Sequence, residues 1–498
     1  ETREYSFITP TPETISNFKD FVDYDYDETR NRYTIDPGEH WFFRERPDRP
    51  LLPPQFRFNW SSPFIISSHN SKKVLFGSNH LFQSLDRGDN WKIISPDLTT
   101  NDKKLRNTSN GGGLTNSNTG GENHFTIITI SDTPIDTTLI WVGTDDGNVQ
   151  VTKDNGDTWH NVKNNIDGIP EKIWVSRVEA SKHSKGRAYV SFDNHRFDDN
   201  KPYVYVTEDY GNTWSDISSN LPQDYSVYVV KEDYVDENLL FVGTEKSVYF
   251  SNDRGTTWEK LGSNLPTVAI HDLVIHPRDG DLIAGTHGRS IWILDDISPL
   301  RFLNEKEDKL LPIRISTKWV KINTGRKQPY FEFRGENPPY GTIINYFSTI
   351  NTEGELIISK NKIDDDSKEP IFRKSLNVKA GINRIVWPFE FERTEDEFFR
   401  YRDNLIKIKK EFKSIAIDKK GLDKYNFIDQ KSFTELNKVR KSFLDDYGMY
   451  ANGVKVFDEK LYDNFEADEG IYNIEIRLNN GKRFTDKIVV REDPLKSN

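Results

Sequence analysis

The sequence contains no cysteine, a single methionine and no long apolar run. Without cysteine, the chain has no disulfide, no thiolate metal ligand and no cysteine nucleophile. No apolar stretch approaches the length that a transmembrane helix requires, so we expect no membrane span. The opening residues, Glu1-Thr2-Arg3, do not resemble a signal peptide, and we interpret the sequence as a mature or truncated chain.

A block of basic residues is missing as well. The chain has 68 Lys and Arg against 79 Asp and Glu, which gives a net charge of −11, and the charges are spread along its length. Nucleic-acid binding is therefore not expected, whereas an acidic surface suits solubility or a neutral or cationic partner. No histidine spacing typical of a metal site occurs, so we expect neither a metal nor another cofactor.

Aromatic residues, in contrast, are plentiful. They make up 13% of the 498 residues and include 11 tryptophans, while charged residues make up 30%. A chain of this length is expected to form two or three domains. Many aromatic side chains combined with many charged ones favour short strands joined by charged turns over a helical bundle.

One eight-residue pattern, Ser/Thr-x-Asp-x-Gly-x-Thr/Asn-Trp, occurs four times. An aspartate in this pattern can accept backbone N–H bonds across a turn, and the glycine can take positive φ without strain. The Ser or Thr hydroxyl can bond within the same loop. We call the pattern the Asp box and interpret it as a structural turn rather than a metal or sugar site. Its aspartates are Asp86, Asp154, Asp209 and Asp253.

Strand patterns flank every Asp box in the same order. Each unit reads as three or four strands, A to D, with the box in the turn between C and D. Strand B carries a small residue near its end, and a fifth copy of this pattern has no box. These small residues are Gly77, Gly143, Ser191, Gly243 and Gly285. Repeated four-stranded units predict a mainly β fold with the blades of a β-propeller, and we expect five blades within residues 56–300.

The boxed repeats resemble those of the Asp-box (BNR-repeat) β-propellers, which include sialidases, xyloglucan-type glycoside hydrolases, a photosystem assembly factor and the sortilins. The resemblance is strongest to bacterial exported proteins of the sortilin-like and glycosyl-hydrolase-like kind. It covers residues 55–300 well and continues more weakly to the C-terminus. The stretches that carry it are Phe58–Pro63, Ser95–Thr99, Asn118–Gly120, Arg196–Asp199 and Gly285–Asp296.

This resemblance implies an extracytoplasmic location: secreted, periplasmic or at the cell surface. Related proteins have more blades than the five expected here. A half-closed propeller exposes unpaired edges. We therefore expect a partner chain or a missing segment to supply further blades.

The chain outside the expected blades has other patterns. Residues 1–55 are interpreted as an N-terminal segment, with possible outer strands of a preceding blade at Phe21–Arg30 and Asn31–Ile35. Residues 301–330 are interpreted as a linker.

The C-terminal part is predicted to be a β-sandwich, formed by residues 331–394 and 448–498, and the resemblance implies that it is immunoglobulin-like. Asn480-Gly481 between two alternating segments is a strong hairpin signal. Residues 395–447 are predicted as a helical insertion, because a capping box at Ser432 precedes apolar residues at helical spacing.

The order of the strands predicts where a ligand binds. In a four-stranded blade the A–B and C–D turns lie at one end of the propeller, and the B–C turns and D–A crossovers lie at the other. Because the Asp boxes are C–D turns, we expect the ligand at the opposite end, where charged turns of varied type converge. The candidate ligand-binding residues are Asn118, Asp145, Arg177, His195, Arg196, His287 and Arg289.

Several of these residues also have a structural interpretation. Arg177 either lines the central channel or forms an ion pair with Glu179 or another neighbour. His287 and Arg289 either hold an anion or take part in blade contacts.

Four carboxylates are candidates for acid–base catalysis: Glu122, Asp146, Asp193 and Glu245. An inverting glycosidase needs two carboxylates roughly 6.5–9.5 Å apart, and sequence spacing cannot establish that distance. Adjacent side chains on a strand point apart, so Asp145 and Asp146 are better interpreted as a solvated turn than as a catalytic pair. The arginine signature of a sialidase is absent.

We therefore interpret the chain as a non-catalytic binding or scaffold protein for a peptide, protein or glycan. One alternative is a glycoside hydrolase that uses carboxylates on the face opposite the Asp boxes. A second alternative is a structural subunit of an envelope complex.

Overall fold

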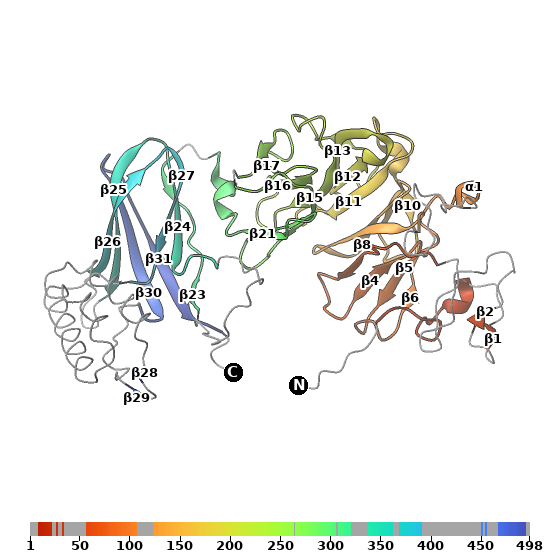
Figure 1. Ribbon diagram of the computed structural model, residues 1–498, viewed down its shortest axis with the longest axis horizontal. Coiled ribbons are helices and arrows are strands. Elements are labelled where there is room, and N and C mark those ends of the chain that lie inside the picture. The colour runs from red at the N-terminus through yellow and green to blue at the C-terminus, as the bar shows by residue number, and fades with distance from the viewer. Residues whose placement is uncertain are drawn as a thin grey trace. The chain divides into compact units, whose positions relative to one another are not determined.

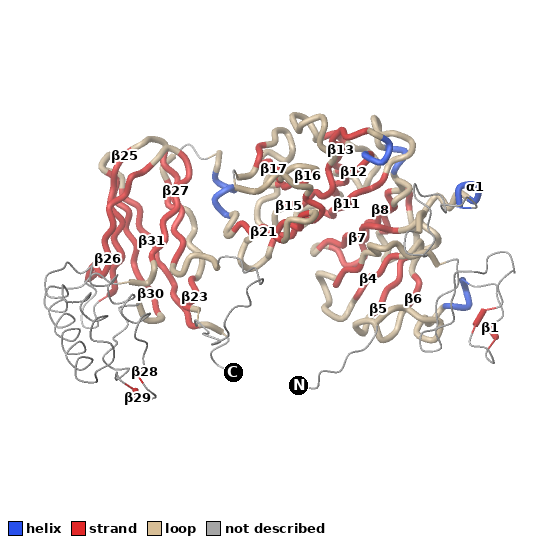
Figure 2. The backbone as a smooth tube through the Cα atoms, viewed as in Figure 1, coloured by secondary structure: helices blue, strands red, loops and turns tan. Residues whose placement is uncertain are grey.

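A computed structural model describes residues 8–21, 26–27, 32–33, 56–106, 123–262, 264–304, 307–319, 337–361, 368–390, 450–451, 454–455 and 467–494. The chain divides into unit 1, Glu1–Arg301, and unit 2, Phe302–Asn498. Strands dominate both units (Figure 2). The helices are short: η1 (Phe18–Phe21), α1 (Lys103–Arg106), η2 (Lys163–Asn165), η3 (His195–Phe197) and η4 (Ser298–Phe302). No described helix has the length and apolar character that a membrane crossing needs.

Five antiparallel sheets form the blades of unit 1, and Figure 1 shows them fanned out in chain order from β4 to β21. Strands are adjacent in each sheet in the order of the sequence, as expected for propeller blades. Blade 1 is β3 (Phe64–Ile66), β4 (Val74–Gly77), β5 (Leu81–Ser84) and β6 (Lys92–Ile93). Blade 2 is β7 (Ile127–Thr133), β8 (Asp136–Thr144), β9 (Val149–Thr152) and β10 (His160–Asn161).

The other three blades follow the same plan. Blade 3 is β11 (Trp174–Ala180), β12 (Ala188–Asn194), β13 (Asp199–Thr207) and β14 (Ser215–Asp216). Blade 4 is β15 (Val227–Glu232), β16 (Leu240–Thr244), β17 (Val248–Ser251) and β18 (Glu259–Lys260). Blade 5 has three described strands, β19 (Ile270–Ile275), β20 (Leu282–Thr286) and β21 (Ile291–Leu294).

The small residue of strand B determines how closely neighbouring blades approach. A Cβ atom added to Gly143 would lie 2.4 Å from Cγ1 of Val175, and one added to Gly243 would lie 2.8 Å from Cγ2 of Ile270. Both contacts join a blade to the first strand of the next blade. Glycine at these two positions thus avoids a collision with the next blade.

The four Asp-box turns share one hydrogen-bond arrangement. In the fourth box the Gly255 N–H donates to the Ser251 hydroxyl at 2.8 Å, and the Thr257 N–H donates to Asp253 at 2.8 Å. The same bonds recur in the boxes of Asp86, Asp154 and Asp209. The box glycines have φ between 85° and 104°, a region that favours glycine. The carboxylates are therefore engaged within their own turns.

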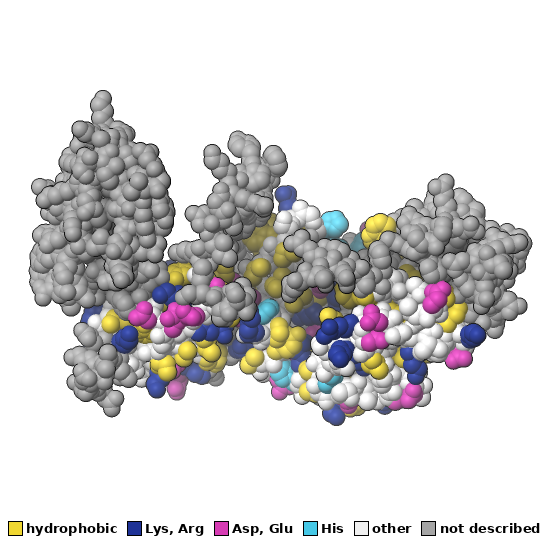
Figure 3. Space-filling view, turned by 90° about the horizontal axis from the view of Figure 1, so that it is seen from below, with side chains coloured by type: hydrophobic (Ala, Val, Ile, Leu, Met, Phe, Trp, Pro, Cys, Tyr) yellow, Lys and Arg dark blue, Asp and Glu magenta, His cyan; other side chains and the backbone are white. Residues whose placement is uncertain are grey.

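Charged side chains of both signs occur together on the visible surface of the described residues (Figure 3). Some ion pairs are buried between blades. Glu179 on blade 3 contacts Lys182 and also accepts a hydrogen bond from Lys231 of blade 4 at 2.8 Å. Burial alone would raise the pKa of Glu179, but the two lysines outweigh it and lower that pKa to about 2.

The N-terminal segment covers part of blade 1. Ile15 forms a bridge with Trp91 and lies in a hydrophobic cluster with Phe56. The outer strands expected in this segment are short: β1 (Tyr26–Asp27) pairs with β2 (Arg32–Tyr33) as a separate two-stranded sheet.

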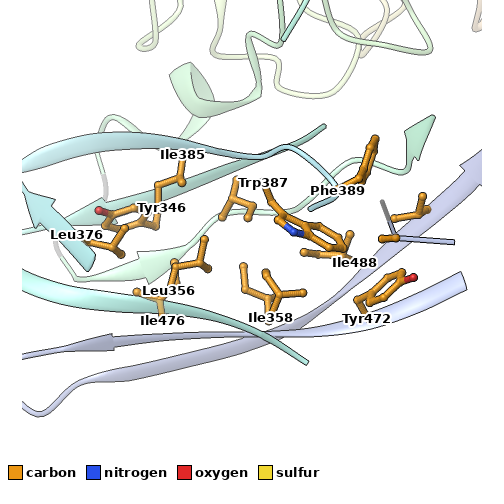
Figure 4. Close-up of a cluster of buried hydrophobic side chains, with 14 of the residues drawn as sticks. Tyr346, Leu356, Ile358, Leu376, Ile385, Trp387, Phe389, Tyr472, Ile476 and Ile488 are labelled. Atoms are coloured by element: carbon orange, nitrogen blue, oxygen red, sulfur yellow. The ribbon is translucent and has the colours of Figure 1, made fainter. Parts of the chain in front are cut away.

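Two of the sheets described in unit 2 share one hydrophobic core. The first sheet has the order β22-β24-β27 and the second β23-β31-β30-β25-β26. In Figure 4, Trp387 and Ile385 of the first sheet point toward Leu356 and Ile358 of the second. The strands are β22 (Lys309–Leu310), β23 (Ser316–Lys318), β24 (Thr342–Ser348), β25 (Thr352–Asn361), β26 (Lys368–Val378), β27 (Gly381–Trp387), β28 (Tyr450–Ala451), β29 (Val454–Lys455), β30 (Gly470–Leu478) and β31 (Arg483–Glu492).

Two features of unit 2 bear on the sequence-based expectations. The hairpin of β30 and β31 turns at Asn480-Gly481, where Gly481 has φ of 87°. The immunoglobulin-like character of the unit stays a prediction, and the helical insertion expected at 395–447 lies outside the described residues.

The segment expected to be a linker, 301–330, includes two strands of unit 2. β22 pairs with β24, and β23 runs parallel to β31. These strands are two and three residues long, too short to show an alternating pattern in the sequence. They supply backbone hydrogen bonds at the edges of the two sheets.

Candidate functional site

A pocket of about 1090 Å³ lies in unit 1, where the first strands of blades 2 to 5 begin. The crossovers before those strands and the B–C turns of blades 3 to 5 supply most of its walls. The Asp boxes, as C–D turns, lie at the other end of the sheets. The pocket is thus at the end where strand order places a ligand.

A β-bulge directs one side chain from each of four blades toward this pocket. In β7, β11, β15 and β19, one residue near the start of the strand has no pairing partner in the second strand of the same blade. These bulged residues are Ile128, Ser176, Tyr228 and His271, and all four line the pocket. A bulge changes the direction of a side chain within a strand. The residues just before them are fully buried: Ile127, Val175, Val227 and Ile270.

Asp193 at the end of β12 holds two basic side chains of the following turn. Its carboxylate is 2.6 Å from Nδ1 of His195 and accepts a hydrogen bond from Nη1 of Arg196 at 2.8 Å. Burial alone would raise the pKa of Asp193, but His195 and Arg196 outweigh it and lower that pKa. The Arg196 guanidinium also lies 3.7 Å from the ring centroid of Trp174. A fixed cation and an ionised carboxylate therefore form one wall.

Tyr228 is the centre of a second cluster, from blades 4 and 5. Its hydroxyl donates to Glu245, and its ring stacks on His271 with centroids 4.5 Å apart. The ring of His287 lies 5.1 Å from that of His271. Burial and Glu245 raise the pKa of Tyr228, so its hydroxyl keeps its proton. Burial and His287 lower the pKa of His271, which favours the neutral imidazole.

Further aromatic surface comes from the crossovers. Trp60 is 81% exposed and lines the pocket, and the ring of His124 stacks on Trp174 with centroids 5.6 Å apart. The side-chain amides of Asn59 and Asn123 lie in the same wall, where they donate to the Thr126 hydroxyl and to the Phe58 carbonyl. Aromatic faces with polar groups at their edges suit a ligand that presents both apolar and hydrogen-bonding surface.

The structure brings together five of the residues that the sequence nominated. Asp193, His195, Arg196, Glu245 and His287 all line the pocket. Asn118 and Glu122 lie outside the described residues.

Asp145 and Asp146 are not among the described residues that line the pocket. Asp145 is fully buried and accepts hydrogen bonds from the N–H and hydroxyl of Thr126. Asp146 accepts hydrogen bonds from the N–H and hydroxyl of Thr100, both at 2.6 Å. Burial, with a smaller effect of Asp145, raises the pKa of Asp146. The two adjacent carboxylates thus bind different loops.

Arg177 and Arg289 are also absent from the described lining. Arg177 donates to Asp272 on blade 5 at 2.8 Å, so its ion pair is with a neighbour other than Glu179. The Arg289 N–H donates to the Thr286 hydroxyl within its own turn.

The sequence reasoning missed several lining residues, including Trp60, Trp174, Tyr228 and His271. Three of them lie at or near the start of a first strand, where regular alternation does not reveal a bulge. One signal was available: near the start of four first strands, the residue that lines the pocket directly follows a Val or Ile.

Comparison with known proteins gives one family match. The family model Sortilin-Vps10, described as sortilin, neurotensin receptor 3, matches residues 202–306. No curated protein matches the chain.

Among solved structures, the chain is similar to a GH74 enzyme of Niastella koreensis, with 16% identity, a TM-score of 0.34, and coverage of 57% of this chain and 41% of that chain. An ancestral GH74 enzyme gives 11% identity, a TM-score of 0.33, and coverage of 68% and 40%. YCF48 from Cyanidioschyzon merolae gives 13% identity, a TM-score of 0.29, and coverage of 51% and 77%. The chain thus spans about two fifths of either GH74 structure. In residues 202–306 the chain is thus similar to the sortilin family, and the bladed sheets of unit 1 have the arrangement of a β-propeller.

Proposed function

We propose that the chain is a non-catalytic binding or scaffold protein outside the cytoplasm, and that its pocket holds a segment of a peptide, protein or glycan. The observation that carries this proposal is the repeated β-bulge. It turns the side chains of Ile128, Ser176, Tyr228 and His271 toward one space from four separate blades. Such a surface offers contacts spread along an extended ligand.

The carboxylates of the pocket favour binding over hydrolysis. The lowered pKa of Asp193 makes it a poor proton donor, whereas a glycosidase acid needs a raised pKa. Glu245 is engaged by the Tyr228 hydroxyl. Asp146 has a raised pKa, but it does not line the pocket, and Thr100 and Thr144 occupy its carboxylate. A glycoside hydrolase is the alternative that the experiment must distinguish.

The test is a glycan array and a peptide library, screened with the intact chain for binding and for released product. Tyr228→Ala should weaken binding of the selected ligand by at least about tenfold, because it removes a central aromatic contact. Tyr234→Ala is the matched control, since Tyr234 lies in the A–B turn of the same blade and is 43% exposed. If product is released, and if Glu245→Gln or Asp193→Asn abolishes that release, the pocket hydrolyses its ligand and the proposal of a binding role is wrong.

We also propose that further blades complete the ring, supplied by a partner chain or by another segment. The two end blades expose apolar side chains on their outer faces: Phe64 of blade 1 is 64% exposed and Ile291 of blade 5 is 69% exposed. Sheet faces of this kind are covered in a closed propeller. A ring completed by a partner chain is also compatible with a structural subunit of an envelope complex.

A further inference from the structure

The outer face of blade 5 is built like the covered faces of the other blades. In each blade one residue of the third strand pairs with the small residue of the second strand. In blades 1 to 4 this residue is at most 1% exposed: Leu81, Val149, Val204 and Val248. Its counterpart in blade 5 is Ile291, which pairs with Gly285 and is 69% exposed. Ile293 on the same strand is 59% exposed.

Gly285 shows the same difference at the level of the backbone. A Cβ atom on Gly77 or Gly143 would meet the first strand of the next blade at 2.9 or 2.4 Å. Among the described residues, the nearest atoms to a Cβ on Gly285 belong to Asp272 of the same blade, at 3.7 Å. Blade 5 thus has room for the first strand of a further blade.

The first strand of blade 1 offers the complementary half of such a junction, whereas Val74 and Phe82 further out on the same face are buried in a cluster with Ile15 and Phe56 of the same chain. Phe64 pairs with Phe76, and the corresponding first-strand residues of blades 2 to 5 are at most 7% exposed: Ile130, Val178, Val230 and Leu273. Phe64 is 64% exposed and Ile66, two residues later, is 61% exposed. Both side chains point away from Ile65, which packs against blade 2.

We propose that a second copy of this chain covers both faces, so that blade 1 of each copy packs on blade 5 of the other. One chain carries both complementary apolar halves of a blade junction, and a twofold arrangement satisfies both at once. The inference rests on the proposal that further blades complete the ring, and it assigns that role to a second copy. No additional polypeptide is then needed to cover either face.

The test mutates each face separately in the intact chain. One variant carries Phe64→Glu and Ile66→Glu, and the other carries Ile291→Glu and Ile293→Glu. The matched control carries Leu85→Glu and Val235→Glu, two exposed apolar residues in turns away from both faces. Sedimentation velocity should show a dimer for the unmodified chain and the control. Each face variant should dissociate with a Kd raised at least about a hundredfold, because it buries unpaired carboxylates.

Mixing provides a second readout that misfolding cannot imitate. An equimolar mixture of the two face variants should form dimers again. In a dimer of one copy of each variant, one of the two junctions joins two unmodified faces. A dimer that both face variants leave intact, or that mixing does not restore, would overturn the proposal.

If the unmodified chain is a monomer, a second copy does not cover the two faces, and the proposal is overturned. Maleimide labelling of Ile293→Cys is then specific, because the chain has no other cysteine. Rapid labelling of the monomer would leave completion of the ring by another polypeptide in place. Labelling slowed to the rate of a buried thiol would mean that the chain covers its own faces, and the proposal that outside blades complete the ring would fail too.

Discussion

The guanidinium of Arg196 lies 3.7 Å from the ring centroid of Trp174, and Asp193 accepts a hydrogen bond from it at 2.8 Å. The carboxylate and the ring together hold the cation at the pocket wall. A planar guanidinium can stack on an aromatic ring while it donates at its edge, whereas a lysine ammonium offers a point charge.

Arg196→Lys should therefore weaken both the pocket wall and ligand binding. We expect the free energy of unfolding to fall by about 0.5–1 kcal/mol through loss of the stacked contact. Urea unfolding followed by tryptophan fluorescence measures this change. Arg278→Lys, in an exposed ion pair with Asp279, should leave stability unchanged. Equal effects of the two substitutions would contradict a special role for the stacked arginine.

Glu179 should make the stability of unit 1 sensitive to acid. Its pKa is about 2 in the folded chain against an ordinary value of 4.5. Because the folded-state pKa is the lower one, its contribution is complete above pH 4.5 and is lost as the pH falls through 2. Glu179→Gln should cost about 3 kcal/mol at neutral pH, since it leaves Lys182 and Lys231 without their buried partner.

The measurement is urea unfolding at a series of pH values. Glu179→Gln should flatten the dependence of the unfolding free energy on pH between 4.5 and 2. The control Glu259→Gln, on the exposed strand β18, should keep the slope of the unmodified chain. An unchanged slope in Glu179→Gln would show that other groups carry the acid sensitivity.

Asp253→Ala should destabilise unit 1 without affecting the pocket. It removes the acceptor for the Ser251 hydroxyl and for the N–H and hydroxyl of Thr257. The turn faces solvent, so we expect a cost of about 1 kcal/mol in thermal or urea unfolding. Asp253→Asn retains one acceptor and should recover part of the loss. Loss of ligand binding at unchanged stability would instead assign the Asp box a ligand.

Gly243→Val and Gly285→Val should differ strongly. A side chain at Gly243 meets Ile270 of the next blade, so we expect a cost of about 1–3 kcal/mol from overpacking. A side chain at Gly285 meets its own blade alone among the described residues, and the unfolding midpoint of the dilute monomer should not change. Sedimentation should show weaker self-association for Gly285→Val. Equal destabilisation by both would show that blade 5 is already covered.

The features that the sequence predicted best are local and repeated. The Asp-box turns depend on residues four apart, such as Ser251 and Gly255, whose types can be read directly. The small residue of strand B is likewise visible, because the close approach of two blades leaves little room for a side chain. Such signals predicted the propeller and the end of it that carries the pocket.

The features that it missed depend on register or on distant partners. Tyr228 and His271 reach the pocket through a bulge, which a strand pattern does not display. The partner of Arg177 is Asp272, two blades further along the chain. Asp145 and Asp146 were candidates because they lie in a B–C turn at the expected ligand end, yet each is occupied by a different loop.

The repeated bulge places a residue that holds the blade junction next to a residue that lines the pocket. Ile127, Val175, Val227 and Ile270 are β-branched and buried at the blade junctions, while the residue that follows each is Ile, Ser, Tyr or His. A substitution at the bulged position changes the pocket surface and leaves the neighbouring junction residue in place. Natural variation can therefore alter ligand preference one blade at a time, and four independent positions are open to selection on a scaffold that need not be rebuilt.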